Sequence, residues 1–537
     1  MKRVALLVAL AAAGALLVRG LGGASGGATG APPPGPKATP RLGINLSSPA
    51  DWSTELPFTD LFRSARGWIS QKDGAPFGAG PKLVLDAHGW ITRLEPGGWA
   101  ETVLSSGLGP HLPSGDYTLV YEGQGELELW GARTTVKQRA PGRLVIALEA
   151  PGENIFLRLR ATSPTDPVRK IRVYLPGLAD TRAPSGPWHP AFLARWKGMA
   201  VVRFMDFQQT NGSKLRHLGD RPTPDDATFA EKGVPVEWLV DLANRLGADP
   251  WFCMPHEADD EYVRGFAEIV KARLDPARRA WIEYSNEVWN GQFPQHGYAV
   301  QMGRKLGLGK DDSTAGLRYT SRRSREIFAI WERAFGGATR LRRALAVQAA
   351  NAEAATELVR FEDGYRRADA LAIAPYFGLV PTPAGAPGGE QPRAAELHGL
   401  SVEQLLDRVE GTALPIALGR MKDARRVAER HGLLLVAYEA GQHLVGVTGA
   451  ENDDALTALF AAANQHPRMG ALYQRYLEAW TQAGGDLLCH FSSVGRNSKW
   501  GNWGLLEYFD DDPRRSPKLM ALLSWARSLG QTVNGPR

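Results

Sequence analysis

The feature that most constrains this chain is a regular alternation of strand and helix patterns after Pro187. Short apolar runs bounded by turn residues alternate there with longer segments whose apolar residues have helical spacing. The predicted strands are 199–204, 249–254, 281–285, 344–348, 370–374, 433–438 and 486–491. The main predicted helices are 236–246, 260–274, 319–335, 402–406, 421–431 and 469–483. With an early strand at 42–46, these units predict an α/β fold, a (β/α)8 barrel.

Between residues 69 and 180 the pattern of apolar and polar residues is different. Short alternating runs separated by Gly and Pro, such as 117–122 and 143–148, follow one another with almost no helical pattern. Such a run predicts a β-sandwich. We expect this domain to be inserted after the first barrel strand, because residues 42–46 precede a helical pattern at 56–68. In the alternative, the early strand belongs to the sandwich and the eighth barrel strand lies elsewhere.

The N-terminus has the layout of a signal peptide. Lys2 and Arg3 precede an apolar run from Val4 to Val18, and small residues follow. We expect residues 1–25 to be a signal peptide or an N-terminal anchor, and residues 26–40 to be a Pro/Gly-rich linker. The remaining predicted units are the first barrel strand and helix at 41–68, the sandwich at 69–180 and the barrel at 181–530. This layout predicts a secreted or periplasmic protein, with a membrane tether as the alternative.

Composition excludes some functions. The formal charge of +6 comes from Arg spread along the 537 residues rather than from a basic stripe, so no nucleic-acid partner is expected. The two cysteines, Cys253 and Cys489, lie in apolar runs and predict buried core residues rather than a disulfide framework or metal ligands. We expect a monomer that needs no cofactor.

Polar residues stand where the predicted barrel strands end. In a barrel of this type the active site gathers at the C-terminal ends of the strands. Those positions hold Arg203, His256, Asn286, Glu287, Tyr376, Glu439 and a loop with Trp500 and Trp503. This set predicts a polar cleft at one end of the barrel.

Two glutamates in that set carry the chemistry. Glu287 ends the fourth predicted strand and Glu439 the seventh, so their side chains can converge across the barrel. Two convergent carboxyls suit glycosidic bond cleavage, in which one protonates the departing oxygen and the other attacks the anomeric carbon. Glu287 would then be protonated near neutrality, and Glu439 ionised. The plainer alternatives are that Asn286 and Glu287 cap a turn and that Glu439 is paired with a barrel Arg.

These motifs resemble the retaining glycoside hydrolases whose (β/α)8 barrels carry catalytic glutamates after strands four and seven, above all the cellulase and mannanase type. The resemblance covers about residues 190–525, plus 42–55 if the sandwich is inserted after the first barrel strand. It implies that Glu287 is the acid/base and Glu439 the nucleophile. It further implies supporting roles for Arg203 and Tyr376 beside the nucleophile, for His256 after the third strand, and for Asn286 on the sugar 2-hydroxyl.

The chain departs from that pattern in two places. Val288 follows the Asn-Glu pair where the family usually has Pro, and the family's strand-eight Trp is missing after Phe491. Trp500 or Trp503, on a Gly-flanked loop, would supply the sugar-stacking surface instead. No metal is expected, because Asp259 or Asp260 after His256 reads as a helix cap.

The function predicted from sequence is an exported retaining O-glycoside hydrolase acting on a β-linked polysaccharide or oligosaccharide. Two alternatives remain open. One is a non-catalytic, cellulose-like glycan-binding protein on a barrel scaffold, and the other is a transglycosylase of extracellular polysaccharide metabolism. The sandwich could bind carbohydrate or only support the barrel.

Overall fold

The structure is a computed structural model that describes residues 39–149, 154–179, 186–379 and 394–536. The predicted signal peptide or anchor, and all of the predicted linker except its last two residues, lie outside this range. Among the helices that the described residues form, none combines the length and the apolar character that crossing a bilayer requires.

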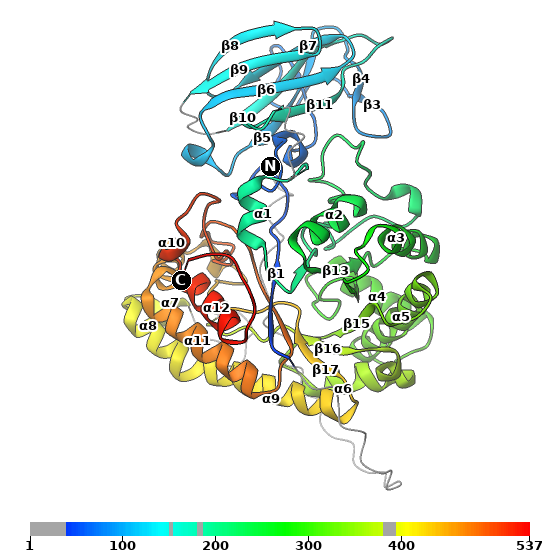
Figure 1. Cartoon of the computed structure of the whole chain (residues 1–537), viewed down its shortest axis with the longest axis vertical. Helices are drawn as coiled ribbons and strands as arrows, with labels where there is room; N and C mark the ends of the chain where they lie inside the picture. Colours follow the sequence, from blue (N-terminus) through cyan, green and yellow to red (C-terminus); the bar gives the residue numbers. More distant parts are fainter. Residues whose placement is uncertain (1–38, 150–153, 180–185, 380–393, 537) are drawn as a thin grey trace.

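Eight parallel strands close into a barrel, which confirms the predicted fold class (Figure 1). They follow one another round the barrel in chain order, and the last pairs with the first. The strands are β1 (Arg41–Asn45), β12 (Val201–Arg203), β13 (Asp249–Met254), β14 (Ala280–Tyr284), β15 (Leu341–Ala346), β16 (Ala370–Ile373), β17 (Leu434–Ala437) and β18 (Leu487–His490).

Side chains along each strand point alternately into the barrel and out toward the helices, so the barrel has an inner and an outer layer of core. On β17 and just beyond it, Leu434, Val436 and Tyr438 face the barrel interior, while Leu435 packs outward against the helices. Trp251 and Trp281 stack inside the barrel with their ring centroids 4.9 Å apart. Both cysteines are buried in this inner layer, as the sequence predicted.

Helices surround the barrel. They are α1 (Pro190–Trp196), α2 (Val236–Leu246), α3 (Asp260–Arg273), α4 (Pro294–Lys305), α5 (Asp312–Phe335), α6 (Ala352–Arg360), α7 (Ala394–Leu397), α8 (Val402–Arg408), α9 (Leu414–Arg430), α10 (Asp454–Gln465), α11 (Pro467–Gln482) and α12 (Pro517–Ser528). The main helices predicted from sequence did not include α1, α4, α6, α7, α10 or α12. It also placed β15 three residues late, because Arg342 and Arg343 interrupt the apolar run there; Arg343 is paired with Asp369 at 2.8 Å.

The strands between β1 and β12 form a separate sandwich with its own core. One sheet has the order β2 (Ile69–Lys72), β5 (Gly98–Ser105), β10 (Ile155–Thr162) and β7 (Gly125–Trp130). The other has the order β11 (Arg169–Tyr174), β6 (Gly115–Glu122), β9 (Arg143–Glu149) and β8 (Arg133–Ala140). A short hairpin, β3 (Val84–Leu85) and β4 (Ile91–Arg93), extends it.

The helix predicted at 56–68 was wrong. Only a single 3-10 turn, Leu61–Ser64, forms there. Pro57 disfavours helical geometry for the residue before it, and the extended segment around it pairs Phe58 with Trp188 and Asp60 with Tyr174. The chain therefore enters and leaves the sandwich side by side. The helix that follows β1 in the barrel is α1, which comes after the sandwich.

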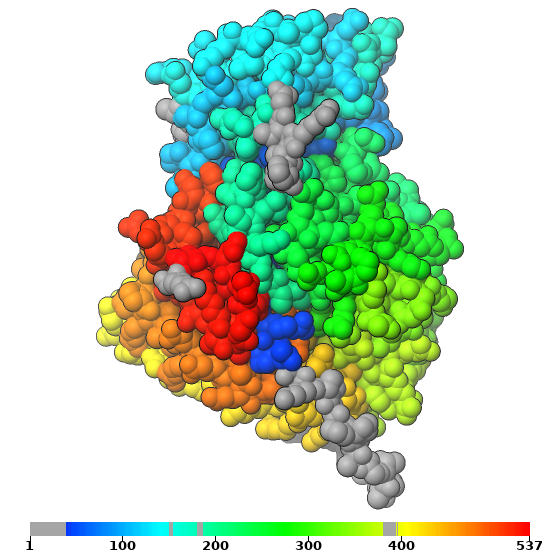
Figure 2. Space-filling view, viewed as in Figure 1, coloured from blue at the N-terminus to red at the C-terminus, as the bar shows by residue number. Residues whose placement is uncertain are grey.

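The sandwich stands over the end of the barrel at which the strands finish (Figures 1 and 2). Buried Arg63 donates to the backbone carbonyls of Pro224 and Asp226 in the loop after β12. His88 contacts the Asp226 carboxylate at 2.9 Å, and His111 contacts Asp510 in the loop after β18 at 2.8 Å. Two of the loops that border the strand ends are thus fixed to the sandwich.

Candidate active site

Arg203 organises the floor of the cleft. Its guanidinium has five N–H groups, and all five are used. Nε and one N–H of Nη2 bind Glu283 Oε2 at 3.1 and 2.9 Å, and the other N–H of Nη2 binds Asn286 Oδ1 at 2.7 Å. Nη1 binds Asn45 Oδ1 at 3.0 Å and Glu439 Oε1 at 2.9 Å. Four side chains from three barrel strands or their ends are therefore held by one group that keeps no donor for a ligand.

The charges around Arg203 are buried. Arg203 is 0% exposed, Glu283 1% and Glu439 5%. One guanidinium thus faces two carboxylates in a site where unpaired charge is costly. Burial raises the pKa of Glu283, which the charge of Arg203 opposes. A third ionised carboxyl in the same place would be strongly disfavoured.

Glu439 has a donor on each oxygen. Arg203 binds Oε1, and the Tyr376 hydroxyl donates to Oε2 at 2.9 Å. These contacts fix the position of the carboxyl and place it in an ion pair with Arg203. A carboxylate that is fixed in this way and lies at a cleft can act as a nucleophile toward an electrophilic carbon.

Glu287 is the second carboxyl of the site, and its surroundings favour the protonated form. Burial, together with the charge of Glu439, raises the pKa of Glu287 to about 8. Its Oε1 accepts from the Tyr438 hydroxyl at 3.3 Å and its Oε2 from Asn290 Nδ2 at 2.9 Å. At neutral pH Glu287 is therefore mostly protonated, as a general acid must be.

The backbone that presents Glu287 is strained. Ser285 and Glu287 have φ values of +56° and +42°, in the left-handed region that non-glycine residues seldom adopt. Hydrogen bonds from Ser285 N to Met254 O, at 2.8 Å, and from Gln295 Nε2 to Asn286 O, at 2.8 Å, hold the segment in place. Such strain persists where the surroundings fix a side chain for a task.

Of the other residues predicted for the site, one joins the Arg203 network and one does not. Asn286 donates through Nδ2 to Asn211 Oδ1 at 3.1 Å, while its oxygen is taken by Arg203. His256 is buried at the end of β13, 3.7 Å from Glu257, and contacts neither Glu287 nor Glu439 through any hydrogen bond of the described residues. The structure thus joins Asn286 to the Arg203 network and leaves His256 outside it. Asp259, beside His256, caps α3 as expected.

The two tryptophans of the 500–503 loop have different surroundings. Trp503 packs edge-on against Tyr376, with centroids 5.7 Å apart, and against Phe491 at 5.8 Å. It also contacts buried His443, whose pKa burial lowers to about 4. Trp500 has Lys499 over its ring and makes no ring contact with the cleft aromatics. Trp503 therefore continues the wall that begins at Tyr376.

Sequence reasoning missed Asn45, Asn290 and three residues of this site with titratable side chains. Glu283 faces inward from β14 and pairs with Arg203, and Tyr438 contacts Glu287. Asp206 follows β12, and burial together with Glu439 raises its pKa to about 7. The signals were present but weak: Glu283 lies in an apolar strand, and Asp206 comes three residues after Arg203.

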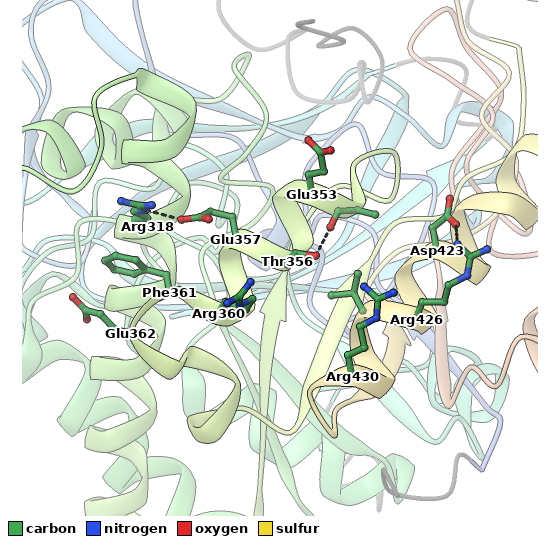
Figure 3. Close-up of a pocket in the computed structure, with 12 residues that line it drawn as sticks. Arg318, Glu353, Thr356, Glu357, Arg360, Phe361, Glu362, Asp423, Arg426 and Arg430 are labelled. Atoms are coloured by element: carbon green, nitrogen blue, oxygen red, sulfur yellow. Dashed lines mark hydrogen bonds and ion pairs between the residues drawn. The ribbon is translucent and has the colours of Figure 1, made fainter. Parts of the chain in front are cut away.

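A hollow on the outside of the barrel is unrelated to these carboxyls (Figure 3). It has a volume of about 680 Å³ and lies between α6 and α9, lined by none of the predicted site residues. Two ion pairs lie within its lining, Arg318 with Glu357 at 2.6 Å and Arg426 with Asp423 at 2.8 Å. It has no arrangement suited to glycoside chemistry.

Among the described residues, one group of side chains could geometrically hold a metal ion. His111, Asp510 and Asp511 place their ligand atoms within 4.8 Å of one another where the sandwich meets the barrel. Asp511 already accepts from the backbone of Glu507 and Tyr508, and His111 stacks on Tyr508. These contacts account for the cluster as part of the domain junction.

Fold and site together define a (β/α)8 barrel with two carboxyls at its strand ends, one in an ion pair with Arg203 and the other with a raised pKa. A scan of protein-family models and a search of curated proteins found no match to the chain. Among solved structures, a 4-O-α-L-rhamnosyl-β-D-glucuronidase from Fusarium oxysporum is 10% identical, with a TM-score of 0.35 over 61% of this chain and 60% of that one.

Two further solved structures are a Bacteroidetes-affiliated cellulase and a Cellulomonas fimi endo-β-1,4-mannanase. Each is 12% identical with a TM-score of 0.35. The cellulase match covers 65% of this chain and 92% of that one, and the mannanase match covers 64% and 67%. Because the sequence identities and the TM-scores are low, the activity of this chain has to be argued from its own residues.

Proposed function

We propose that this protein is a retaining glycoside hydrolase that cleaves β-linked oligosaccharides or polysaccharides by double displacement. The observation that carries the proposal is the contrast between its two carboxyls. Glu439 is held as a carboxylate by Arg203 and Tyr376, whereas burial beside Glu439 keeps Glu287 protonated near neutrality. Two carboxyls in these two states are the requirement for acid-assisted nucleophilic cleavage of a glycoside.

The reaction would proceed in two steps. In the first, a Glu439 oxygen bonds to the anomeric carbon as the glycosidic C–O bond breaks, and Glu287 gives its proton to the departing oxygen. In the second, ionised Glu287 takes a proton from water, whose oxygen attacks the same carbon as the bond to Glu439 breaks. Trp503 and Tyr376 would form the apolar wall beside the sugar.

The test is labelling with 2-deoxy-2-fluoro-β-glycosyl fluorides of the gluco, manno and xylo series, followed by mass spectrometry of the peptide that contains Glu439. A covalent adduct on Glu439 supports the proposal and names the sugar. Absence of an adduct from every series, with oligosaccharide binding unchanged in Glu439→Gln, would instead indicate a glycan-binding protein. Transfer of the labelled glycosyl group to an added sugar in preference to water would indicate a transglycosylase.

We further propose that the protein is exported through its apolar N-terminus. Support comes from the order of charged, apolar and small residues in positions 1–25. Expression in a bacterial host and N-terminal sequencing of the mature product test this. A product that keeps Met1 and stays in the cytoplasm would contradict it.

A further inference from the structure

Glu287 is contacted from below by a chain of two donors. The Tyr438 hydroxyl donates to Glu287 Oε1 at 3.3 Å, and the indole Nε1 of Trp289 donates to that hydroxyl oxygen at 3.3 Å. Tyr438 is 0% exposed and packs in the cluster that fills the barrel interior. The Oε1 oxygen of Glu287 is therefore the one that faces the protein interior.

The second oxygen of Glu287 has a different neighbour. Oε2 accepts from Asn290 Nδ2 at 2.9 Å. The orientation of this amide is fixed, because Asn290 Oδ1 accepts from the backbone N–H of Gln292 at 3.2 Å. Asn290 lies in the loop beyond β14, so this loop holds Oε2 while Tyr438, just beyond β17, holds Oε1.

The direction of the donor chain follows from hydrogen-bond chemistry. An indole N–H can only donate, so the Tyr438 oxygen accepts from Trp289, and the phenolic hydrogen needs an acceptor of its own. Glu287 Oε1 is the acceptor that the described residues offer to it. The phenolic hydrogen therefore lies between the Tyr438 oxygen and Glu287 Oε1, and the carboxyl hydrogen of Glu287 points elsewhere.

We propose that Tyr438 is a positioning residue that orients the Glu287 carboxyl for proton transfer by donating to Oε1. This inference rests on the function proposed above. With Tyr438 donating to Oε1 and Asn290 to Oε2, the plane of the carboxyl is fixed, and its hydrogen points away from Tyr438 and can pass to the glycosidic oxygen. In the second step the ionised carboxyl takes a proton from water, and Tyr438 keeps its own proton throughout.

The test compares Tyr438→Phe with Tyr117→Phe as a matched control. Tyr117 is a buried tyrosine of the sandwich whose hydroxyl donates to Pro113 O at 2.7 Å, so its loss removes a similar bond far from the cleft. The substrates are phenyl and 2,4-dinitrophenyl β-glycosides of the sugar that labels Glu439. The phenyl leaving group requires acid assistance and the dinitrophenyl group does not.

In Tyr438→Phe, kcat/KM for the phenyl glycoside should fall by about tenfold, while the value for the dinitrophenyl glycoside changes by less than about twofold. The alkaline limb of the pH profile should move to higher pH, because the lost hydrogen bond had lowered the pKa of Glu287. Tyr117→Phe should alter neither quantity. Equal losses on both substrates, or an unmoved alkaline limb, would overturn the inference.

Two further measurements separate the possible failures. If Tyr438→Phe does not fold, Trp289→Phe removes only the outer donor and should shift the leaving-group dependence in the same direction; no shift overturns the inference. Labelling of Glu439 in the wild-type protein reports on the proposed function independently. Wild-type labelling combined with an unchanged leaving-group dependence in Tyr438→Phe would refute the role of Tyr438 alone.

Discussion

Replacing Arg203 by Lys is the most direct test of the network beneath the cleft. The substitution keeps a positive charge between Glu283 and Glu439 but removes the planar guanidinium group. An ammonium has three N–H donors, whereas Arg203 uses five, so at least two of its present hydrogen bonds are lost.

The magnitude follows from those contacts. Hydrogen bonds that involve charged groups contribute about 1.5–3 kcal/mol each, so two of them predict a loss of at least about 3 kcal/mol in the free energy of unfolding. All partners are buried, so solvent screening does little to reduce this value. Glu439 also loses a defined position, and a shift of about 1 Å can slow a reaction about 100-fold.

The assay combines guanidinium unfolding with the rate at which a 2-fluoro-glycosyl fluoride labels Glu439. We expect a lower unfolding midpoint and about 100-fold slower labelling in Arg203→Lys. Arg323→Lys is the control, because Arg323 on α5 binds Asp260, Glu326 and the Ala258 carbonyl outside the cleft. Arg323→Lys should label at the wild-type rate. A wild-type midpoint and labelling rate in Arg203→Lys would refute the reasoning.

Three further predictions follow from the same site and its support. Between about pH 5 and 8, the free energy of unfolding of the wild-type protein should fall as the pH rises. The reason is that folded Glu287, with a pKa of about 8, keeps a proton that the unfolded chain releases near about 4.3. In Glu287→Gln this fall with pH should be less steep, and equal slopes in the two proteins would contradict the prediction. Tyr376→Phe should slow labelling of Glu439 about tenfold with little change in stability, since it removes one donor from the nucleophile, and an unchanged rate would exclude that role. Burial lowers the pKa of Lys518 to about 7, below its value of about 10.4 in the unfolded chain, so this residue should make the protein more stable as the pH rises over that interval. Unfolding midpoints measured at pH 7 and 9.5 should lack this contribution in Lys518→Met.

Much of the site followed from local sequence. Arg203, Glu287, Tyr376 and Glu439 were predicted to meet because each follows an apolar strand and parallel barrel strands end at one rim. Strand position is a short-range property that hydrophobic patterning encodes well. The barrel itself could be predicted for the same reason.

Other features could not be predicted from neighbours in the chain. The segment 56–68 has a helical pattern, yet its pairing with residues 174 and 188 keeps it extended at the entrance to the sandwich. Tyr438 reads as one more core aromatic after an apolar strand, and its hydroxyl acquires a partner only across the barrel. Local propensity is overruled where long-range contacts supply a better set of hydrogen bonds.

The sequence by itself determined the layers of the fold and the rim at which the polar residues collect, because the alternation of apolar residues sets which face of each strand is buried. Only the tertiary structure decided the protonation of the site. The pKa of Glu287 depends on its burial and on its proximity to Glu439, and Glu439 is held by an ion pair with Arg203, although these residues are far apart in the chain. Electrostatic interactions depend on distance in space and on exclusion of water, and both are fixed only when the barrel closes.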